Sequence, residues 1–132
     1  MIKYRLVRKV NPMKKGEPAK WYGNPIVNEK VDTRALSTEG TEFTSLSPNE
    51  FESAMYELGH KLARGLIAGN SIKINDLGTF RLSFSSDGVA EVTDFYAQTM
   101  IKDPHIIFTP EKSLMKAIAD NLSYENAGVV DD

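Results

Sequence analysis

The stretch that decides the fold is Ser71-Ile72-Lys73-Ile74-Asn75-Asp76-Leu77-Gly78-Thr79-Phe80-Arg81-Leu82-Ser83-Phe84. Apolar and polar residues alternate on both sides of its centre, which is the two-residue period of strands with one buried face. Asn75-Asp76-Leu77-Gly78 supplies the residues of a sharp reversal, and Gly78 accepts a positive φ at little steric cost. The stretch therefore predicts a β-hairpin with one apolar and one polar face.

Toward the C-terminus, Ser85-Ser86-Asp87-Gly88 predicts a turn or the root of an excursion, and residues 89–102 leave the structure undecided. His105-Ile106-Ile107-Phe108 predicts another strand. Thr109-Pro110-Glu111 has a capping residue followed by proline, which predicts the start of a final helix. The residues from Tyr124 to Asp132 are polar and small, so we expect them to fray.

Toward the N-terminus, Ser47-Pro48-Asn49-Glu50 predicts a capping box and a long helix that ends at Gly69. Gly59 and Gly65 are costly in a helix interior, so we expect another backbone to approach them closely, although simple tolerance is the alternative. Asp32 predicts the N-cap of a shorter helix that breaks near Gly40.

The first 30 residues predict two strands. Ile2, Tyr4 and Leu6 alternate with basic residues over about seven positions, and Asn11-Pro12 ends that strand. Residues 13–18 predict an exposed loop, and residues 21–27 a short strand interrupted by Pro25. The adjacent aromatic pair Trp21-Tyr22 is compatible with stacking on bases or with packing at the edge of a core, and core packing is the favoured interpretation.

Composition limits the class of protein. A chain of 132 residues is long enough for one domain and one core. The absence of cysteine excludes disulfides, thiolate metal sites and cysteine catalysis, and it favours an intracellular location. The sequence shows no signal peptide and no window of about 18 apolar residues that would span a bilayer.

Charge is distributed unevenly along the chain. The formal net charge is -2, yet residues 1–20 carry seven basic side chains against Glu17 alone. A basic arm on an acidic body is typical of a protein that binds nucleic acid or an acidic partner, and a solvated strand face is the alternative.

The motifs of common enzymes are absent from the sequence. We find no phosphate-binding glycine loop, no His-x-x-x-His pair and no Gly-x-Ser-x-Gly elbow. His60 and His105 are isolated, and a small enzyme would require a cleft that converges on one of them. We therefore expect a binding module rather than an enzyme, with no cofactor, no metal and no small-molecule substrate.

Two motifs carry a resemblance to a known family. Ile72-Lys73-Ile74 leads into Leu77-Gly78-Thr79-Phe80, and Phe108-Thr109-Pro110-Glu111-Lys112-Ser113-Leu114 stands where the family has Phe-x-Pro-Gly-x-x-Leu. With the order of helices and strands, this resembles the HU/IHF-type histone-like DNA-binding family of bacteria over residues 31–123. The basic first strand with Asn11-Pro12 is similar to an HU-like subgroup that carries an N-terminal extension.

The resemblance implies an α+β, HU/IHF-like fold and an intertwined homodimer whose sheets form a saddle over DNA. It implies a role for Gly59 and Gly65 in the contact between helices, and it places Leu77, Phe80 and Phe108 in a shared core. We expect three parts: residues 1–30 as a β extension packed on the domain, residues 31–123 as the HU-like DNA-binding domain, and residues 124–132 as a flexible tail.

The predicted function is binding of double-stranded DNA with low sequence preference by a cytoplasmic, nucleoid-associated architectural protein without a membrane partner. Its mechanism is electrostatic contact with phosphates. The residues expected to carry it lie in the N-terminal segment, on the polar face of the hairpin and just beyond it: Lys3, Arg5, Arg8, Lys9, Lys14, Lys15, Lys20, Lys73, Arg81, Ser83, Ser85 and Lys102.

One departure from the family pattern supports a second hypothesis. Family members extend a long basic arm tipped with a proline, whereas residues 86–103 here contain four carboxylates against Lys102 alone. Wedge-type kinking of DNA is therefore not predicted, and the basic extension can substitute for the arm. The alternative is a protein-interaction or structural module that has lost DNA binding. A surface shared by the N-terminal cations with Lys73 and Arg81 favours DNA, and cations scattered over opposite faces favour the module.

Overall fold

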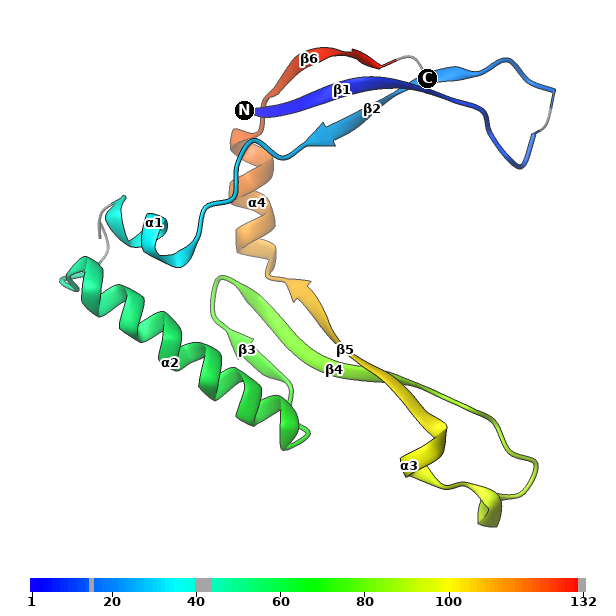
Figure 1. Cartoon of the computed structure of the whole chain (residues 1–132). Helices are drawn as coiled ribbons and strands as arrows, with labels where there is room; N and C mark the ends of the chain where they lie inside the picture. The colour runs from blue at the N-terminus through cyan, green and yellow to red at the C-terminus, as the bar shows by residue number, and fades with distance from the viewer. Residues whose placement is uncertain (15, 40–43, 131–132) are drawn as a thin grey trace.

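Two three-stranded sheets lie at the two ends of one helix. A computed structural model describes residues 1–14, 16–39 and 44–130. In this part of the chain, one sheet has the strand order β2-β1-β6 and the other has the order β3-β4-β5. Helix α4 joins them, with one sheet at its top and the other at its bottom (Figure 1). The strands of the first sheet are β1 (Ile2–Lys9), β2 (Lys20–Ile26) and β6 (Tyr124–Val130), those of the second are β3 (Ile72–Ile74), β4 (Gly78–Ser86) and β5 (Ile101–Pro110), and α4 spans Lys112–Asn121.

The predicted hairpin is confirmed by β3 and β4, which pair antiparallel with Ile74 opposite Gly78. Positive φ occurs in the turn at Asp76 (63°) and at Gly78 (158°). Gly78 is needed for space as well, because a Cβ there would lie 2.5 Å from the Phe108 ring and 2.5 Å from the Thr109 carbonyl oxygen. The rings of Phe80 and Phe108 pack with centroids 4.7 Å apart, so this end of the sheet is closely packed.

Helices α1 (Thr33–Thr38) and α2 (Pro48–Ile67) begin at the predicted caps. The Asp32 carboxylate accepts a hydrogen bond from the Ala35 N–H at 2.9 Å, and the Ser47 hydroxyl accepts one from the Glu50 N–H at 3.2 Å. The reciprocal bond of a capping box, from the Glu50 side chain, is not formed within the described residues. The predicted break at Gly40 lies outside the described residues.

The C-terminal end of α2 is a complete Schellman motif. The Asn70 N–H donates to the Gly65 carbonyl at 3.1 Å, and the Gly69 N–H, at φ 90°, donates to the Leu66 carbonyl at 3.0 Å. Gly65 is approached closely, but by the Ile72 side chain rather than by a backbone. A Cβ at Gly59 would meet nothing within 4 Å. The prediction that another backbone approaches Gly59 closely is therefore wrong within a single chain.

Beyond the turn, β4 and β5 continue together as an arm that ends in residues 87–100. A bulge between Ser83 and Ser85 shifts their register. The undecided region contains a short 3₁₀ helix, η1 (Val92–Asp94), and one helical turn, α3 (Ala97–Met100). The predicted excursion is therefore an exposed loop with two short helical turns at the end of the arm, seen at the lower right of Figure 1.

The start of α4 differs from the prediction. The helix begins at Lys112, and Pro110 is the last residue of β5, so capping by Thr109 with Pro110 in the first turn is wrong. Contacts with the hairpin turn hold the start of the helix instead. The Ser113 hydroxyl donates to the Asp76 carboxylate at 3.0 Å, and the Glu111 N–H donates to the Leu77 carbonyl at 3.0 Å.

The predicted flexible tail is also wrong for residues 124–130, because they form strand β6. It pairs parallel with β1, with Ile2 opposite Tyr124 and Leu6 opposite Val129. An extra residue in β6 makes a bulge where Gly128 has φ 132° and its N–H donates to the Asn126 side chain at 2.9 Å. The first and last strands of the described chain are thus neighbours in one sheet.

The second strand runs through Pro25 without interruption, which also differs from the prediction. Pro25 lies in β2 opposite Tyr4, and β2 is an edge strand of its sheet, which is where proline is tolerated in sheets. The strands of the N-terminal extension lie together with β6 at the opposite end of α4 from the hairpin (Figure 1).

Burial within a single chain is slight. Among the described residues, Leu66 is the one hydrophobic residue that is buried, with 4% of its surface exposed. On α4, Met115 is 49% and Ile118 is 44% exposed, so the apolar stripe of this helix faces solvent. Because apolar burial is the main favourable term in folding, one copy of the chain does not close a core by itself.

Candidate nucleic-acid interface

Four basic side chains share one face of the β1–β2 hairpin. Successive side chains of a strand alternate between faces, and residues directly opposite each other point the same way. The register places Lys9 opposite Lys20, Val7 opposite Tyr22, and Arg5 opposite Asn24. We call this side the cationic face, and it carries Lys3, Arg5, Lys9 and Lys20 together with Tyr22 and Asn24.

The other side of the same sheet is apolar. It carries Ile2, Tyr4, Leu6, Trp21, Pro25, Tyr124 and Val129. Arg8 lies opposite Trp21 and therefore belongs to this apolar face. The basic residues predicted as one group are thus divided, because Lys14 lies in the exposed loop with its ammonium 3.8 Å from the Glu17 carboxylate, and Lys15 falls outside the described residues.

The electrostatics of the cationic face favour an anion. Within the described residues, none of its four basic side chains takes part in an ion pair. The Lys9 ammonium donates to the Asn24 carbonyl oxygen at 3.4 Å. The three strands of this sheet contain one carboxylate, Glu125 on β6, which lies opposite Lys3. The positive charge of this face is therefore available to a ligand.

The polar face of the hairpin sheet is poorer in free charge. It brings together Lys73, Arg81 and Ser83, with Ser85 and Lys102 paired beyond the bulge. The Lys73 ammonium lies 3.5 Å from the Glu111 carboxylate, and the Lys102 ammonium lies 2.9 Å from the Asp87 carboxylate. Two of the three predicted cations of this region are therefore held by neighbouring acids.

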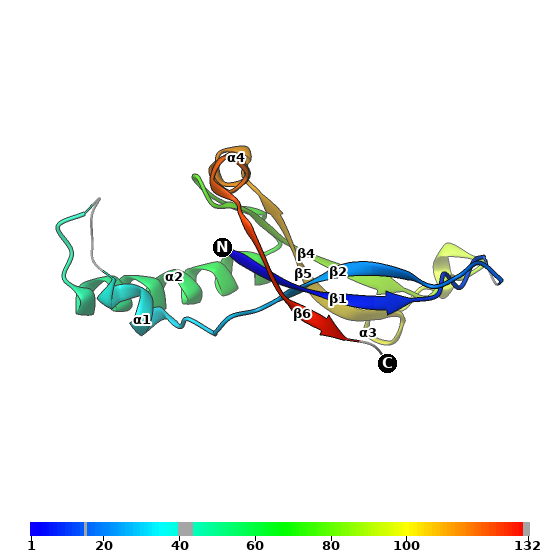
Figure 2. The ribbon, with the colours of Figure 1, turned by 90° about the horizontal axis from the view of Figure 1, so that it is seen from above.

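The N-terminal cations and Lys73 with Arg81 lie on different sheets. Figure 1 shows these sheets at opposite ends of α4, and in Figure 2 the β1–β2 hairpin and the arm extend to the same side of the molecule. The chain therefore has two separate basic patches rather than one shared surface. The N-terminal cations are not scattered over opposite faces either, because four of them share one face of the β1–β2 hairpin.

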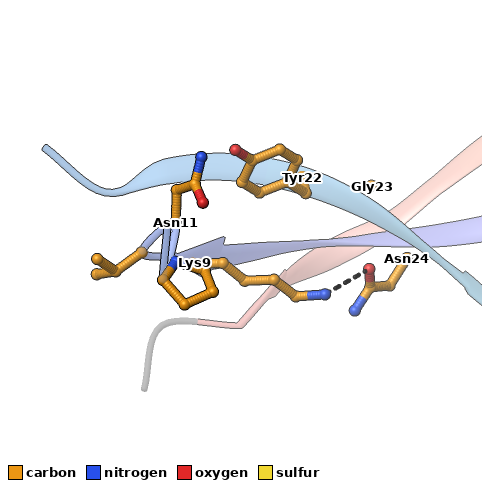
Figure 3. Close-up of a pocket in the computed structure, with 7 residues that line it drawn as sticks. Lys9, Asn11, Tyr22, Gly23 and Asn24 are labelled. Carbon is orange, nitrogen blue, oxygen red and sulfur yellow. Dashed lines mark hydrogen bonds between the residues drawn. The ribbon is translucent and has the colours of Figure 1, made fainter. Parts of the chain in front are cut away.

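A pocket opens on the cationic face at the end of the hairpin (Figure 3). It is lined by Lys9, Val10, Asn11, Pro12, Tyr22, Gly23 and Asn24. The sequence indicated Asn11 only as a strand terminator and gave no role to Asn24. The sequence alone gives no signal for this pair, because only the pairing of β1 with β2 brings residues 9–12 and 22–24 into one pocket lining.

The two histidines lie in different elements, His60 in α2 and His105 in β5. His60 packs edge-on against Tyr56 on α2, with centroids 4.6 Å apart, and the His105 ring nitrogen lies 2.8 Å from the Asp103 carbonyl. Within the described residues, no group of three potential metal ligands occurs. None of the helices described is both long enough and apolar enough to cross a membrane.

Comparison with known proteins identifies the family of this chain. An HU-type domain is the class that the fold and the hairpin motifs define, and residues 1–126 match the family HU-HIG, an HU domain fused to wHTH, Ig or a glycine-rich motif. The chain belongs to this family. No curated protein matches its sequence.

A solved structure shows the same fold. It is that of a presumed bacterial DNA-binding protein from Bacteroides vulgatus, with a TM-score of 0.66 and 16% sequence identity. The alignment covers 98% of this chain and 49% of the other, so this chain spans about half the length of that protein.

Proposed function

We propose that the protein binds double-stranded DNA with low sequence preference, through phosphate contacts from the cationic face. The observation that carries the proposal is the gathering of Lys3, Arg5, Lys9 and Lys20 on one face without carboxylate partners among the described residues. Lysine and arginine contacts to phosphates supply most of the affinity in non-specific binding. Membership of an HU-type family and the DNA-binding neighbour support the same ligand.

The proposed working form is a homodimer. Its support is the lack of a closed core in one chain, together with the exposed apolar stripe of α4. A second copy that covers these residues would supply the missing burial, as obligate dimers do. In a dimer the cationic face would occur twice, on either side of the twofold axis. A nucleoid-associated, architectural role in the cytoplasm belongs to this proposal.

The hairpin sheet has a secondary part in the proposal. Arg81, Ser83 and Ser85 contact phosphates beside the two ion-paired lysines, Lys73 and Lys102, which must first leave their acids. Exposed ion pairs contribute little stability, so DNA can displace them. Residues 1–30 therefore act as the main DNA-binding segment, and residues 31–123 as the dimerising and supporting part.

Titration of the chain with a mixed-sequence duplex tests this function. The four phosphate contacts of one cationic face give a slope of about -3.6 for log K against log salt concentration, which corresponds to a loss of roughly 150-fold in affinity between about 50 and 200 mM salt, and engagement of both faces of a dimer would make the slope steeper. A second duplex of unrelated sequence should bind within a few-fold of the first. No detectable binding at about 50 mM salt would sink the proposal.

A second candidate function, a protein-interaction module, is favoured by the end of the arm. Residues 87–100 contain Asp87, Glu91 and Asp94 with no basic residue, and Val92 is 92% and Tyr96 is 58% exposed. The carboxylates repel DNA, and exposed apolar side chains beside them suit a protein partner. A stable dimer that shows no DNA binding in the titration would support this candidate.

A further inference from the structure

The pocket on the cationic face has the composition of a ligand site. Its lining comes from both strands of the hairpin and from the residues that follow β1 (Figure 3). Small-ligand sites combine a concave surface with a few converging polar groups. The polar groups here are the Lys9 ammonium, the amides of Asn11 and Asn24, and the Tyr22 hydroxyl.

The hydrogen bonds already formed in the pocket make it rich in donors. The side-chain oxygen of Asn11 (Oδ1) accepts from the Met13 N–H at 3.0 Å, and the side-chain oxygen of Asn24 (Oδ1) accepts from the Lys9 ammonium at 3.4 Å. Each amide therefore keeps its NH₂ group for a ligand, and the ammonium keeps further N–H groups. No carboxylate lines the pocket. Charged and neutral N–H donors without a competing acid suit a phosphate group.

One wall of the pocket is aromatic. Tyr22 is 43% exposed, and its ring lies between Asn11 and Asn24 in Figure 3. Val10 and Pro12 add apolar surface to the same lining. An exposed aromatic ring beside basic groups is the arrangement that stacks on nucleobases, because every base has a π-face. Trp21, in contrast, lies on the opposite, apolar face and does not reach the pocket lining.

We infer that this pocket binds a single nucleotide, with its phosphate at the Lys9 ammonium and the neighbouring Asn24 amide, and with its base against Tyr22 on the side of Asn11. A base inside a duplex is stacked on both sides and cannot offer its face. The nucleotide is therefore either an unpaired unit of a DNA strand or a free nucleotide, which share this chemistry. In the first case the inference deepens the proposed DNA binding and rests on it.

Binding by fluorescence anisotropy, with a blunt duplex and with the same duplex carrying a short single-stranded overhang, tests the pocket. We expect the overhang duplex to bind more tightly, and Tyr22→Leu to weaken its binding by roughly 5- to 100-fold, the range of one base stack. The same substitution should weaken blunt-duplex binding by a smaller factor than overhang binding, because it removes no charge. Tyr22→Phe keeps the ring and should retain the preference, and Trp21→Leu is the matched control on the opposite face.

The outcomes separate this inference from the proposed function. Equal affinity for the two duplexes would overturn the inference that the pocket binds a nucleotide, and so would a preference for the overhang duplex that survives Tyr22→Leu. Neither result would contradict the proposed binding of duplex DNA. Overhang binding that depends on Tyr22 without any blunt-duplex binding overturns the duplex proposal and supports the pocket. Free deoxyadenosine monophosphate as a competitor then identifies the source: displacement of the overhang duplex indicates a free nucleotide, and its failure indicates a unit of the strand.

Discussion

Both sheets of the molecule carry cations on one face and apolar residues on the other, but they differ in what surrounds the cations. In the β2-β1-β6 sheet, Lys3, Arg5, Lys9 and Lys20 lie on a face without ion pairs among the described residues. In the β3-β4-β5 sheet, two of three cations contact acids and the arm beyond them is acidic.

The difference teaches that the number of basic residues near a sheet does not decide its ligand. A phosphate must compete with any carboxylate that already holds a cation, and the arm supplies such carboxylates while the N-terminal sheet has only Glu125. In the proposed function, the N-terminal sheet therefore carries the main DNA contacts and the hairpin sheet has a secondary part. Four predictions test how far this contrast extends.

The largest effect is expected from ending the chain after Ser123, which removes β6. The remaining β1–β2 hairpin is a two-stranded sheet, and isolated hairpins are marginal in water. We expect amide hydrogen exchange in β1 and β2 to rise to the rate of unprotected amides, while β4 and β5 keep their protection. Equal protection of β1 in the shortened and full chains would show that β6 contributes little.

Neutralising the cationic face comes second. Lys3→Gln, Arg5→Gln, Lys9→Gln and Lys20→Gln together should lower duplex affinity by roughly 10²- to 10³-fold at about 100 mM salt, since four phosphate contacts are lost. The matched variant on the other sheet carries Lys73→Gln, Arg81→Gln and Lys102→Gln, and we expect less than about tenfold. Anisotropy titrations measure both. The reverse ranking would return the main DNA contact to the arm.

The third prediction compares how closely the two sheets are packed around one glycine in each, Gly78 in β4 and Gly23 in β2. Gly78→Ala forces a Cβ to 2.5 Å from the Phe108 ring and the Thr109 carbonyl, so we expect a loss of about 3 kcal/mol in the free energy of unfolding. Gly23→Ala meets only Tyr4 Cδ2 at 3.6 Å and should change stability by less than about 0.5 kcal/mol. Urea unfolding measures both. Similar losses would mean that the N-terminal sheet is as closely packed as the hairpin.

The smallest effect is expected from releasing a paired cation. Asp87→Asn frees the Lys102 ammonium from its 2.9 Å ion pair, and one added phosphate contact should raise duplex affinity by about two- to eightfold at about 100 mM salt. Glu29→Gln, in the exposed segment after β2, removes the same charge without freeing a lysine and serves as the control. Equal gains in both variants would indicate net charge alone rather than a contact at the arm.

Local signals in the sequence predicted the local structure. The hairpin turn at Asn75–Gly78, the caps at Asp32 and Ser47 and the stop at Gly69 were all readable, because each depends on hydrogen bonds or dihedral angles within about four residues. The start of α4 was mispredicted for a related reason. Thr109 and Pro110 resemble a cap locally, but pairing with β4 keeps both in a strand.

Long-range pairing could not be predicted in the same way. Residues 124–130 include Asn126 and Gly128, which have low strand propensity, and their strand exists because β1 offers an unpaired edge and a bulge accommodates the glycine. The division of the basic residues between two faces also depends on register. Asn11 and Asn24 line one pocket only because β1 and β2 pair with each other.

The parallel pairing of β1 with β6 has a consequence for synthesis of the chain. A ribosome completes β1 well over 100 residues before it completes β6, which takes roughly 6–25 s at ordinary elongation rates. During that interval the partner strand does not yet exist, and Ile2, Tyr4 and Leu6 belong to an unfinished sheet. Strand β1 therefore acquires its final structure long after it is synthesised, whereas the hairpin of β3 and β4 can form while translation continues.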